Sequence, residues 1–389
     1  MIKLIGYFVL FISLACHAGN PMVVLKTGAE QPKKYLPQIQ NKQVGLVVNH
    51  TSEINGTHLV DFLLSKNIKV KTIFAPEHGF RGNAAAGEEI KDGVDAKTGI
   101  PLVSLYGKNR KPTPEQLQGL DVVIFDVQDV GCRFYTYIST LHLVLEACAE
   151  NHVSLLVLDR PNPNGDYVAG PVLQPKFQSF VGMDPIPIVH GCTVGELAQM
   201  INGEHWYDGN NKCELTVIPV ENYTHKTRYT LPVKPSPNLP NDLSVRLYPS
   251  LCFFEATSVS VGRGTPFPFQ VLGGPDSTLG SFTFVPEDIA GVAENPLNEG
   301  KVCYGIDLRT LRQVPEFTLK YFLEFYHRFK NEKDFLTREN WLNLLAGTDE
   351  LIQQIRIGKT EEDIIRSWQP QLTKYKEIRK KYLLYPDFE

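Results

Sequence analysis

The stretch DVVIFDVQDVGCRFYTY, residues 121–137, joins an apolar segment to a cluster of polar residues. Its first part, residues 121–126, is almost continuously apolar, as expected for a strand buried on both faces of a sheet. A helical pattern occupies residues 136–150, and another apolar segment occupies residues 153–158. A strand, a helix and a second strand in this order predict a βαβ unit with parallel strands.

The rest of the first half shows the same alternation. Residues 44–48 and 69–74 have the pattern of buried strands, with a helical pattern at residues 57–66 between them. Thr193 and Glu196 form a capping-box pattern at the start of a later helix. We therefore predict an α/β fold in which a parallel sheet carries helices on both faces. The sequence has neither a GxGxxG after a strand nor a GxxxxGK[ST], so it predicts no nucleotide cofactor.

The second half has a different organisation. A proline-rich passage at residues 231–240 has the extended character of a crossing between domains. Beyond it we expect short strands near residues 253–260, 281–285 and 302–308, and a last helix at about residues 361–381. The chain therefore divides into a parallel α/β domain, residues 23–235, and a smaller α+β domain, residues 236–389, which closes a cleft.

Residues 1–18 have the pattern of a secretory signal peptide. Lys3 precedes an apolar run that is too short to span a bilayer, and small residues allow cleavage after Ala18. The alternative is a lipoprotein signal in which Cys16 carries a lipid anchor. Both predict an exported protein, periplasmic or extracellular. No later segment is long and apolar enough to predict a transmembrane span.

Charge and cysteine usage narrow the class of protein. The formal net charge of −4 argues against a nucleic-acid-binding protein. The cysteines after Cys16 are widely scattered and show no CxxC spacing, so we favour buried free thiols over disulfides and predict no metal site. These cysteines are Cys132, Cys148, Cys192, Cys213, Cys252 and Cys303.

Polar residues follow several of the predicted strands. The carboxyl ends of parallel strands meet at one edge of a sheet, and open α/β sheets bind ligands in the crevice beyond that edge. We therefore expect these residues to form one polar and aromatic cleft. The candidates at the strand ends are Asn49, Glu77, His78, Asp126, Gln128, Asp129, Arg133, Tyr135, Tyr137 and Asn162.

Most of these residues also have a structural interpretation. Glu77 could accept hydrogen bonds from backbone N–H groups of its own turn. Asp126 or Asp129 could cap the following helix. Asp159 and Arg160 could form a structural ion pair.

Other catalytic patterns are missing from the sequence. Glu77 and His78 lack the second histidine of an HExxH zinc motif, and no serine lies in a GxSxG turn. His190 is two residues from Cys192, which is too close in sequence for a convincing base and nucleophile. His190 could equally be a hydrogen-bonded loop histidine.

Carboxylates among aromatic and amide side chains suit the cleavage of a glycosidic bond. That reaction needs an acid for the leaving oxygen and a second group for the anomeric carbon. In the second domain, Glu255 and Arg263 extend this set. Arg263 lies between Gly262 and Gly264, which lets it approach a ligand closely, and a guanidinium binds a carboxylate in bidentate fashion.

The chain contains several long motifs in order: APEHGFRG, FDVQDVGCRFYTY, LDRPNPNGDYVAGPVL, IPIVHGCTVGELA, PSPNLP and FFEATSVSVGRGTPFPF. In these motifs it resembles the bacterial DUF1343 family, which is associated with exo-β-N-acetylmuramidases of the NamZ type. The resemblance implies a Rossmann-like N-terminal domain, a smaller C-terminal domain and a cleft between them. It also implies removal of terminal N-acetylmuramic acid (MurNAc) from the non-reducing ends of peptidoglycan fragments. The glutamate proposed as catalytic in the family corresponds to Glu77.

Three positions depart from the family pattern. Cys192 stands where the family usually has methionine, Ala256 where it has glycine, and Asp166 where it has a second glycine. We expect these changes to affect fine specificity more than the reaction.

The resulting hypothesis is an exported, metal-independent glycoside hydrolase acting on peptidoglycan-derived MurNAc glycosides. Glu77 is expected to be the general acid and Asp126 the second carboxylate, with Asp129 and Glu255 as substitutes. The 2-acetamido group of the substrate is an alternative nucleophile. Competing hypotheses are a non-catalytic murein-binding protein and a cell-wall esterase or amidase.

Substrate binding is assigned to further residues of the same motifs. Arg133 or Arg263 is expected to hold the lactyl carboxylate that distinguishes MurNAc from N-acetylglucosamine (GlcNAc). The sugar pocket is expected to include Asn49, His78, Gln128, Tyr135, Tyr137, Asn162 and His190.

Overall fold

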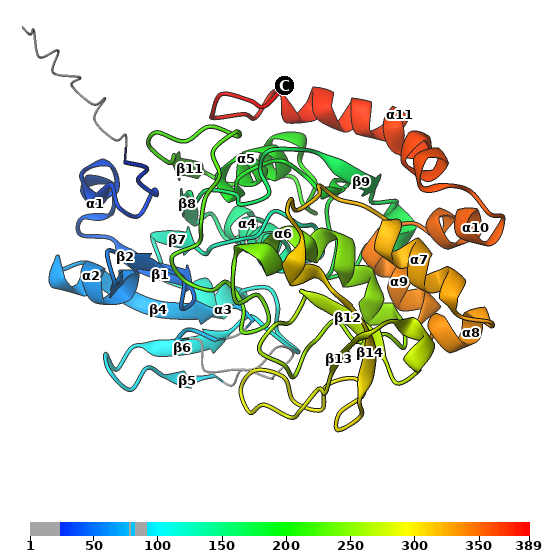
Figure 1. The fold of residues 1–389 in the computed structure, drawn as a ribbon. Helices are drawn as coiled ribbons and strands as arrows, with labels where there is room; N and C mark the ends of the chain where they lie inside the picture. The colour runs from blue at the N-terminus through cyan, green and yellow to red at the C-terminus, as the bar shows by residue number, and fades with distance from the viewer. Residues whose placement is uncertain (1–23, 78, 82–91) are drawn as a thin grey trace, which may run out of the picture.

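The computed structural model describes residues 24–77, 79–81 and 92–389 (Figure 1). Within these residues, a seven-stranded sheet has the order β11-β8-β7-β1-β4-β6-β5, and its pairs are parallel except for β5 with β6. The strands span Leu215–Ile218 (β11), Ser154–Leu158 (β8), Val122–Asp126 (β7), Gln43–Val48 (β1), Lys69–Ala75 (β4), Pro101–Ser104 (β6) and Gly93–Val94 (β5). The predicted parallel sheet is confirmed.

Helices cover both faces of this sheet. They span Pro32–Ile39 (α1), Leu59–Ser65 (α2), Tyr137–Glu150 (α4) and Val194–Glu204 (α5). Successive residues of a strand point to opposite faces, so neighbours in β1 enter different cores. Val47 packs in the core that includes residues of α4 and α5, whereas Leu46 and Val48 pack with residues of α1 and α2. The predicted capping box also forms, because the Thr193 hydroxyl and the Glu196 carboxylate each accept the other's backbone N–H.

The order of the strands indicates where a ligand crevice forms. From β1 the chain adds β4 and β6 on one side, and then adds β7, β8 and β11 on the other. Crevices form outside the carboxyl ends of the strands at such a switch point. Here these ends are Val48 of β1 and Asp126 of β7, and Glu77 lies two residues beyond β4.

The C-terminal region is an α+β unit, as predicted. Its antiparallel sheet has the order β12-β14-β13, with strands Val271–Gly274, Cys303–Asp307 and Phe282–Phe284. β12 was not expected, since two of its four residues are glycines, which weaken a strand pattern. The helices of this region span Asp242–Leu251 (α6), Lys320–Arg328 (α7), Glu332–Phe335 (α8), Glu339–Ala346 (α9), Glu350–Arg356 (α10) and Glu361–Arg379 (α11).

The strand predicted near residues 253–260 is wrong. Residues Cys252–Ala256 form a short 3₁₀-helix, η2. Phe253 and Phe254 are both buried, and both rings contact Phe322, with ring centroids 6.0 and 5.5 Å from it. Successive residues of a strand would point in opposite directions, so burial of both rings on one side favours a helical turn.

The end of the chain packs against the first domain (Figure 1). In α11, Arg379 donates hydrogen bonds from Nε and Nη2 to the Gly191 carbonyl at 3.0 and 2.7 Å. Farther along, the Tyr385 hydroxyl donates to Asp159 Oδ2 at 2.5 Å. These contacts fasten the C-terminal helix to the parallel sheet and hold the two parts of the chain together.

Three further expectations concern the whole molecule. The prediction of buried free thiols is confirmed for Cys132, Cys148, Cys192, Cys213, Cys252 and Cys303. In the described ranges, no helix is long and apolar enough to cross a membrane, and no group of three or more potential ligands is arranged to hold a metal.

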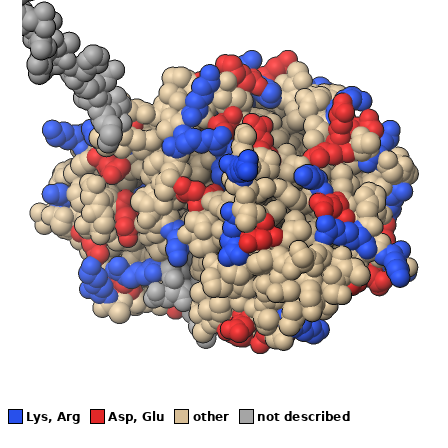
Figure 2. All heavy atoms as spheres, viewed as in Figure 1, with Lys and Arg blue, Asp and Glu red and all other residues tan. Residues whose placement is uncertain are grey.

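Basic and acidic side chains are interspersed over the face shown in Figure 2.

Candidate active site

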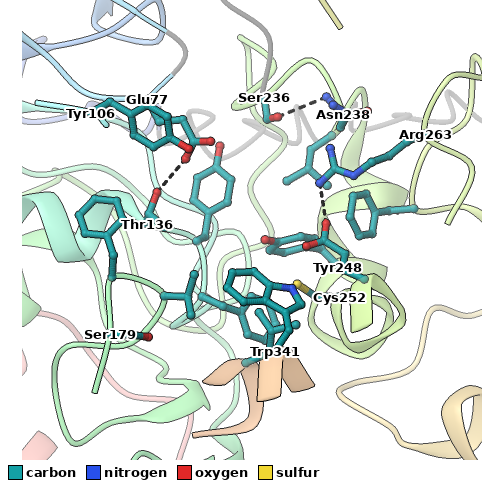
Figure 3. A pocket seen from close by; sticks show the side chains of 18 of the residues that line it. Glu77, Tyr106, Thr136, Ser179, Ser236, Asn238, Tyr248, Cys252, Arg263 and Trp341 are labelled. Carbon is teal, nitrogen blue, oxygen red and sulfur yellow. Dashed lines mark hydrogen bonds and ion pairs between the residues drawn. The ribbon is translucent and has the colours of Figure 1, made fainter. Parts of the chain in front are cut away.

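A cavity of about 360 Å³ lies between the carboxyl edge of the sheet and the C-terminal region (Figure 3). One wall comes from residues that follow β4, β6 and β7. The opposite wall comes from residues 236–269 and from Trp341 of α9. Of the residues predicted from the sequence, the cavity lining contains Glu77, Tyr135, Glu255 and Arg263.

Two hydroxyl groups hold Glu77, and a third lies beside its carboxylate. Its Oε2 accepts a hydrogen bond from the Thr136 hydroxyl at 2.9 Å, and its backbone carbonyl accepts one from the Tyr137 hydroxyl at 3.3 Å. Burial, together with the neighbouring Glu77 carboxylate, raises the pKa of the Tyr106 hydroxyl. Figure 3 shows Glu77, Tyr106 and Thr136 together on one side of the cavity. This carboxyl group therefore has a defined position.

Glu255 and Arg263 form an ion pair on the other side of the cavity. Arg263 Nη2 lies 2.6 Å from Glu255 Oε1, and its guanidinium lies 5.1 Å from the centre of the Phe269 ring. Burial opposes the charged form of Arg263, but the charge and hydrogen bond of Glu255, together with Tyr248 and Cys252, outweigh it and raise the pKa of the guanidinium. Gly262 and Gly264 have positive φ angles of 81° and 78°, a conformation that favours glycine. The two glycines thus allow the chain to turn at Arg263, which lines the cavity as expected.

The cavity lining contains three buried polar atoms without a hydrogen-bond partner in the described structure. They are Oγ of Ser179, the acceptor Oδ1 of Asn238 and the donor Nε1 of Trp341. The Asn238 amide is oriented by its Nδ2, which donates to the Val292 carbonyl at 2.8 Å. Buried polar groups are nearly always paired with protein, ligand or ordered water, so these atoms offer hydrogen-bond positions to a polar ligand or to water in the cavity.

Asp126 does not line the cavity, and the structure corrects its assignment as the second carboxylate. It is fully buried at the end of β7. Its Oδ1 and Oδ2 accept hydrogen bonds from Arg160 Nε at 2.5 Å and Nη2 at 2.9 Å. Both oxygens are occupied by one guanidinium, so Asp126 has a structural role. Glu255 is the predicted substitute that shares the cavity with Glu77.

Arg133 is also absent from the cavity lining. It is fully buried and donates hydrogen bonds to the carbonyls of Pro171, Ile186 and Leu345. Burial lowers the pKa of its guanidinium to about 9. Its side chain ties the two domains together from inside, so the prediction that it binds a substrate carboxylate is wrong.

Three more predicted pocket residues have structural partners instead. Gln128 donates from Nε2 to the carbonyls of Asp129 and Pro161, both at 2.8 Å. Asn162 donates to the Cys192 carbonyl, and His190 accepts the Cys192 N–H at Nδ1. Burial lowers the pKa of His190 to about 3, which leaves the ring neutral. These side chains hold loops behind the cavity and do not line it.

A polar layer lies beneath Glu77. Tyr137 is buried next to Asn49, and Asn49 Oδ1 accepts hydrogen bonds from the backbone N–H and hydroxyl of Thr51. Asp129 is buried near Tyr135 and Tyr137 and accepts the Gly131 N–H at 2.7 Å. Asn49, Asp129 and Tyr137 therefore support the site from behind. His78 lies outside the described residues.

Asp129 should make folding stability depend on pH. Burial raises its pKa to about 7, whereas an unfolded aspartate has a pKa of about 3.9. The folded state therefore binds more protons between these values, and stability falls as pH rises from about 4 to 7. Urea unfolding should be measured at several pH values. As the pH rises from about 4 to 7, the free energy of unfolding of Asp129→Asn should increase by about 2–4 kcal/mol relative to that of wild type. The exposed Asp208→Asn is the control, and an equal pH profile for Asp129→Asn and wild type would contradict the prediction.

A second cavity of about 510 Å³ continues from the first. The two share Glu77, Tyr106, Glu255, Arg263 and Trp341. The first chamber is lined by aromatic, hydroxyl and amide groups, whereas the second includes residues 259–261 and 292–297, which contribute both apolar and polar side chains. Both carboxylates therefore lie at the junction of two chambers.

Several lining residues were missed by sequence reasoning. Tyr106 and Arg110 follow β6, whose apolar residues after Pro101 were a usable strand signal. Ser236 and Asn238 lie in the proline-rich passage, which was interpreted only as a crossing between domains. Trp341 had no signal, since it lies in a helix far along the chain.

Comparison with known protein families identifies the family to which this chain belongs. Residues 44–243 match the N-terminal domain model of exo-β-N-acetylmuramidase NamZ, and residues 246–385 match the C-terminal domain model. The chain belongs to the NamZ family. It is 38% identical over 373 residues, 90% of this chain and 89% of the relative, to peptidoglycan β-N-acetylmuramidase NamZ of Bacillus subtilis (strain 168).

Two solved DUF1343 family proteins from Bacteroides fragilis NCTC 9343 share the fold. One is 45% identical with a TM-score of 0.87, and the alignment covers 94% of this chain and 99% of that protein. The other is 28% identical with a TM-score of 0.80, covering 94% and 100%. The resemblance to this family, expected from the motifs, is confirmed.

The three departures from the NamZ family pattern lie outside the lining of the first chamber. Cys192 is buried, with its Sγ 3.4 Å from the Tyr375 hydroxyl. Ala256 is buried at the end of η2. Asp166 forms ion pairs with Arg228 and Arg246. Each departure is therefore accommodated by local packing.

Proposed function

We propose that this chain is an exo-acting β-N-acetylmuramidase that hydrolyses terminal, non-reducing MurNAc from peptidoglycan fragments. The observation that carries the proposal is the presence of Glu77 and Glu255 at the junction of two chambers in a member of the NamZ family. The Bacillus subtilis relative is named as a peptidoglycan β-N-acetylmuramidase.

The two carboxyl groups suit different steps of glycosidic cleavage. Glu77, held by hydroxyl groups, would donate the proton that the leaving oxygen requires. Glu255, paired with Arg263, would act at the anomeric carbon, where positive charge develops in the transition state. The assignment of Glu255 replaces that of Asp126.

The two chambers suit the two sides of the scissile bond. The first chamber would hold the terminal sugar, because tyrosine rings can stack on a sugar face and the unpartnered atoms of Asn238 and Trp341 can pair with its polar groups. The wider second chamber would hold the leaving part of the fragment. The scissile bond would then lie at the junction, beside Glu77 and Glu255.

A chromogenic β-MurNAc glycoside tests the proposed function directly. Release of the chromophore, with slower or no release from the β-GlcNAc analogue, is the expected result. Binding of MurNAc without release would support a murein-binding protein, and cleavage of cell-wall ester or amide bonds would support the third hypothesis. Either of these results, without glycoside release, would overturn the proposal.

Glu255→Gln should lower kcat/KM for the β-MurNAc glycoside by about five- to thirtyfold. Glutamine keeps a hydrogen-bond acceptor for Arg263 but removes the negative charge, and a charge interaction in a partly exposed cleft is worth about 1–2 kcal/mol. Asp126→Asn provides the comparison, because that carboxylate lies outside the cavity. A stronger catalytic loss in Asp126→Asn than in Glu255→Gln, with both variants folded, would reverse the assignment.

Export belongs to the same proposal. Residues 1–18 would act as a signal peptide, with cleavage after Ala18, and the enzyme would work in the periplasm or outside the cell. Mass spectrometry of the mature N-terminus should find Gly19. An acylated Cys16 would instead identify a lipoprotein.

A further inference from the structure

An enzyme that distinguishes MurNAc from GlcNAc must recognise one chemical group. The two sugars differ by a lactyl ether, which carries a carboxylate, on O3 of MurNAc. The proposed cleft already contains the carboxyl groups of Glu77 and Glu255. Binding another anion beside them is unfavourable unless a positive charge is available.

The described lining of the first chamber contains the guanidinium groups of Arg110 and Arg263. Arg263 is already paired with Glu255 at 2.6 Å, so its charge is largely compensated. Arg133, the other cation suggested by the sequence motifs, is enclosed by backbone carbonyls behind the chamber. The environment of Arg110 therefore has to be compared with those of Arg263 and Arg133.

The Arg110 guanidinium is positioned without an acidic partner among the described residues. It lies 4.2 Å from the centre of the Phe180 ring, which holds it through a cation–π contact. A guanidinium stacked on a ring keeps the N–H groups at its edge free to donate, which suits bidentate binding of a carboxylate. Its charge acts on the Tyr106 hydroxyl, which contacts Glu77, so Arg110 lies near the reactive end of the chamber.

We infer that Arg110, stacked on Phe180, forms the anion subsite that recognises the lactyl carboxylate and thereby selects MurNAc over GlcNAc. This inference rests on the proposed function and names the residue that determines its specificity. It replaces the earlier expectation for Arg133 and Arg263.

The measurement is kcat/KM for two chromogenic substrates that differ at one group. One is the β-MurNAc glycoside, and the other is the same glycoside with its lactyl carboxylate converted to the neutral amide. Wild type should prefer the acid, and Arg110→Ala should reduce this preference by about ten- to a hundredfold, the scale of a charge-assisted hydrogen bond. Arg110→Lys should keep part of the preference, because the charge remains without the bidentate geometry.

Two variants separate this role from general effects of charge. Lys108→Ala removes an exposed positive charge from the same loop, outside the cavity lining, and should leave the acid-to-amide ratio unchanged. Arg338→Ala removes a cation that lines the second chamber, where it stacks on Trp341 at 5.2 Å. A shift of the ratio in Arg338→Ala and not in Arg110→Ala would place the carboxylate in the second chamber and overturn the inference.

Inhibition by free sugars gives an independent readout. MurNAc should inhibit wild type more strongly than GlcNAc, and Arg110→Ala should lose most of this difference.

If wild type cleaves the β-MurNAc glycoside while Arg110→Ala keeps both the acid preference and the MurNAc preference, the inference is wrong and the proposed function stands. If wild type cleaves no glycoside, the proposed function fails. In that case, strong MurNAc binding that Arg110→Ala abolishes would still support the anion subsite, and unchanged binding would reject it.

Discussion

Replacing Glu77 with glutamine should lower kcat for β-MurNAc glycosides by about a hundredfold to ten-thousandfold, the range for a positioned proton donor. Glutamine has nearly the same shape and can still accept the hydrogen bond that Thr136 donates to Oε2. It cannot give a proton to the leaving oxygen. Folding and binding of MurNAc should therefore survive while turnover is lost.

The nature of the leaving group sharpens this test. An activated aryl leaving group needs less protonation than a sugar, so Glu77→Gln should lose less activity on an activated glycoside than on a MurNAc-containing fragment. Glu377→Gln, an exposed change on α11, is the matched control. Near-normal turnover of the sugar substrate by Glu77→Gln would remove Glu77 from the role of general acid.

Asp126→Ala should lower the free energy of unfolding by about 3–5 kcal/mol, because it leaves the buried Arg160 guanidinium without its anionic partner. Urea denaturation at pH 7 measures the change. The double variant Asp126→Leu with Arg160→Met should be more stable than Asp126→Ala, since no buried charge is left unpaired.

Asp126→Asn distinguishes this structural role from catalysis. It should lose stability, because asparagine cannot neutralise Arg160, and its folded fraction should keep a kcat within about tenfold of wild type. A variant with wild-type stability and no turnover would instead support the original assignment of Asp126 as a catalytic carboxylate.

Sequence patterns predicted the first domain well because its strands are buried on both faces. Strands such as β1 and β7 are nearly continuous apolar segments, and a helix pattern separates β7 from β8. The C-terminal region was harder, because its strands are short and contain glycine. The pair Phe253–Phe254 has strong strand preference, but both rings are buried and both contact Phe322, which a helical turn allows.

Glu77 could be found from the sequence because a polar residue directly after a parallel strand lies at the ligand crevice. The same argument was misleading for Asp126 and Arg133. A residue at the end of a strand can point into the crevice or into the interior, and sequence spacing alone does not distinguish the two. Arg160 and the backbone carbonyls around Arg133 occupy these side chains, and all those partners lie at least 34 residues away in sequence.

The sequence by itself determined the α/β class, the family motifs and the place of Glu77, because these depend on local periodicity and on short segments. Only the tertiary structure decided that Glu255 is the carboxylate opposite Glu77, and that Arg110 is the guanidinium in the first chamber without a described acidic partner. These properties depend on which side chains from distant segments meet. A charge is available to a substrate only when no neighbouring group has already compensated it, and that depends on three-dimensional packing.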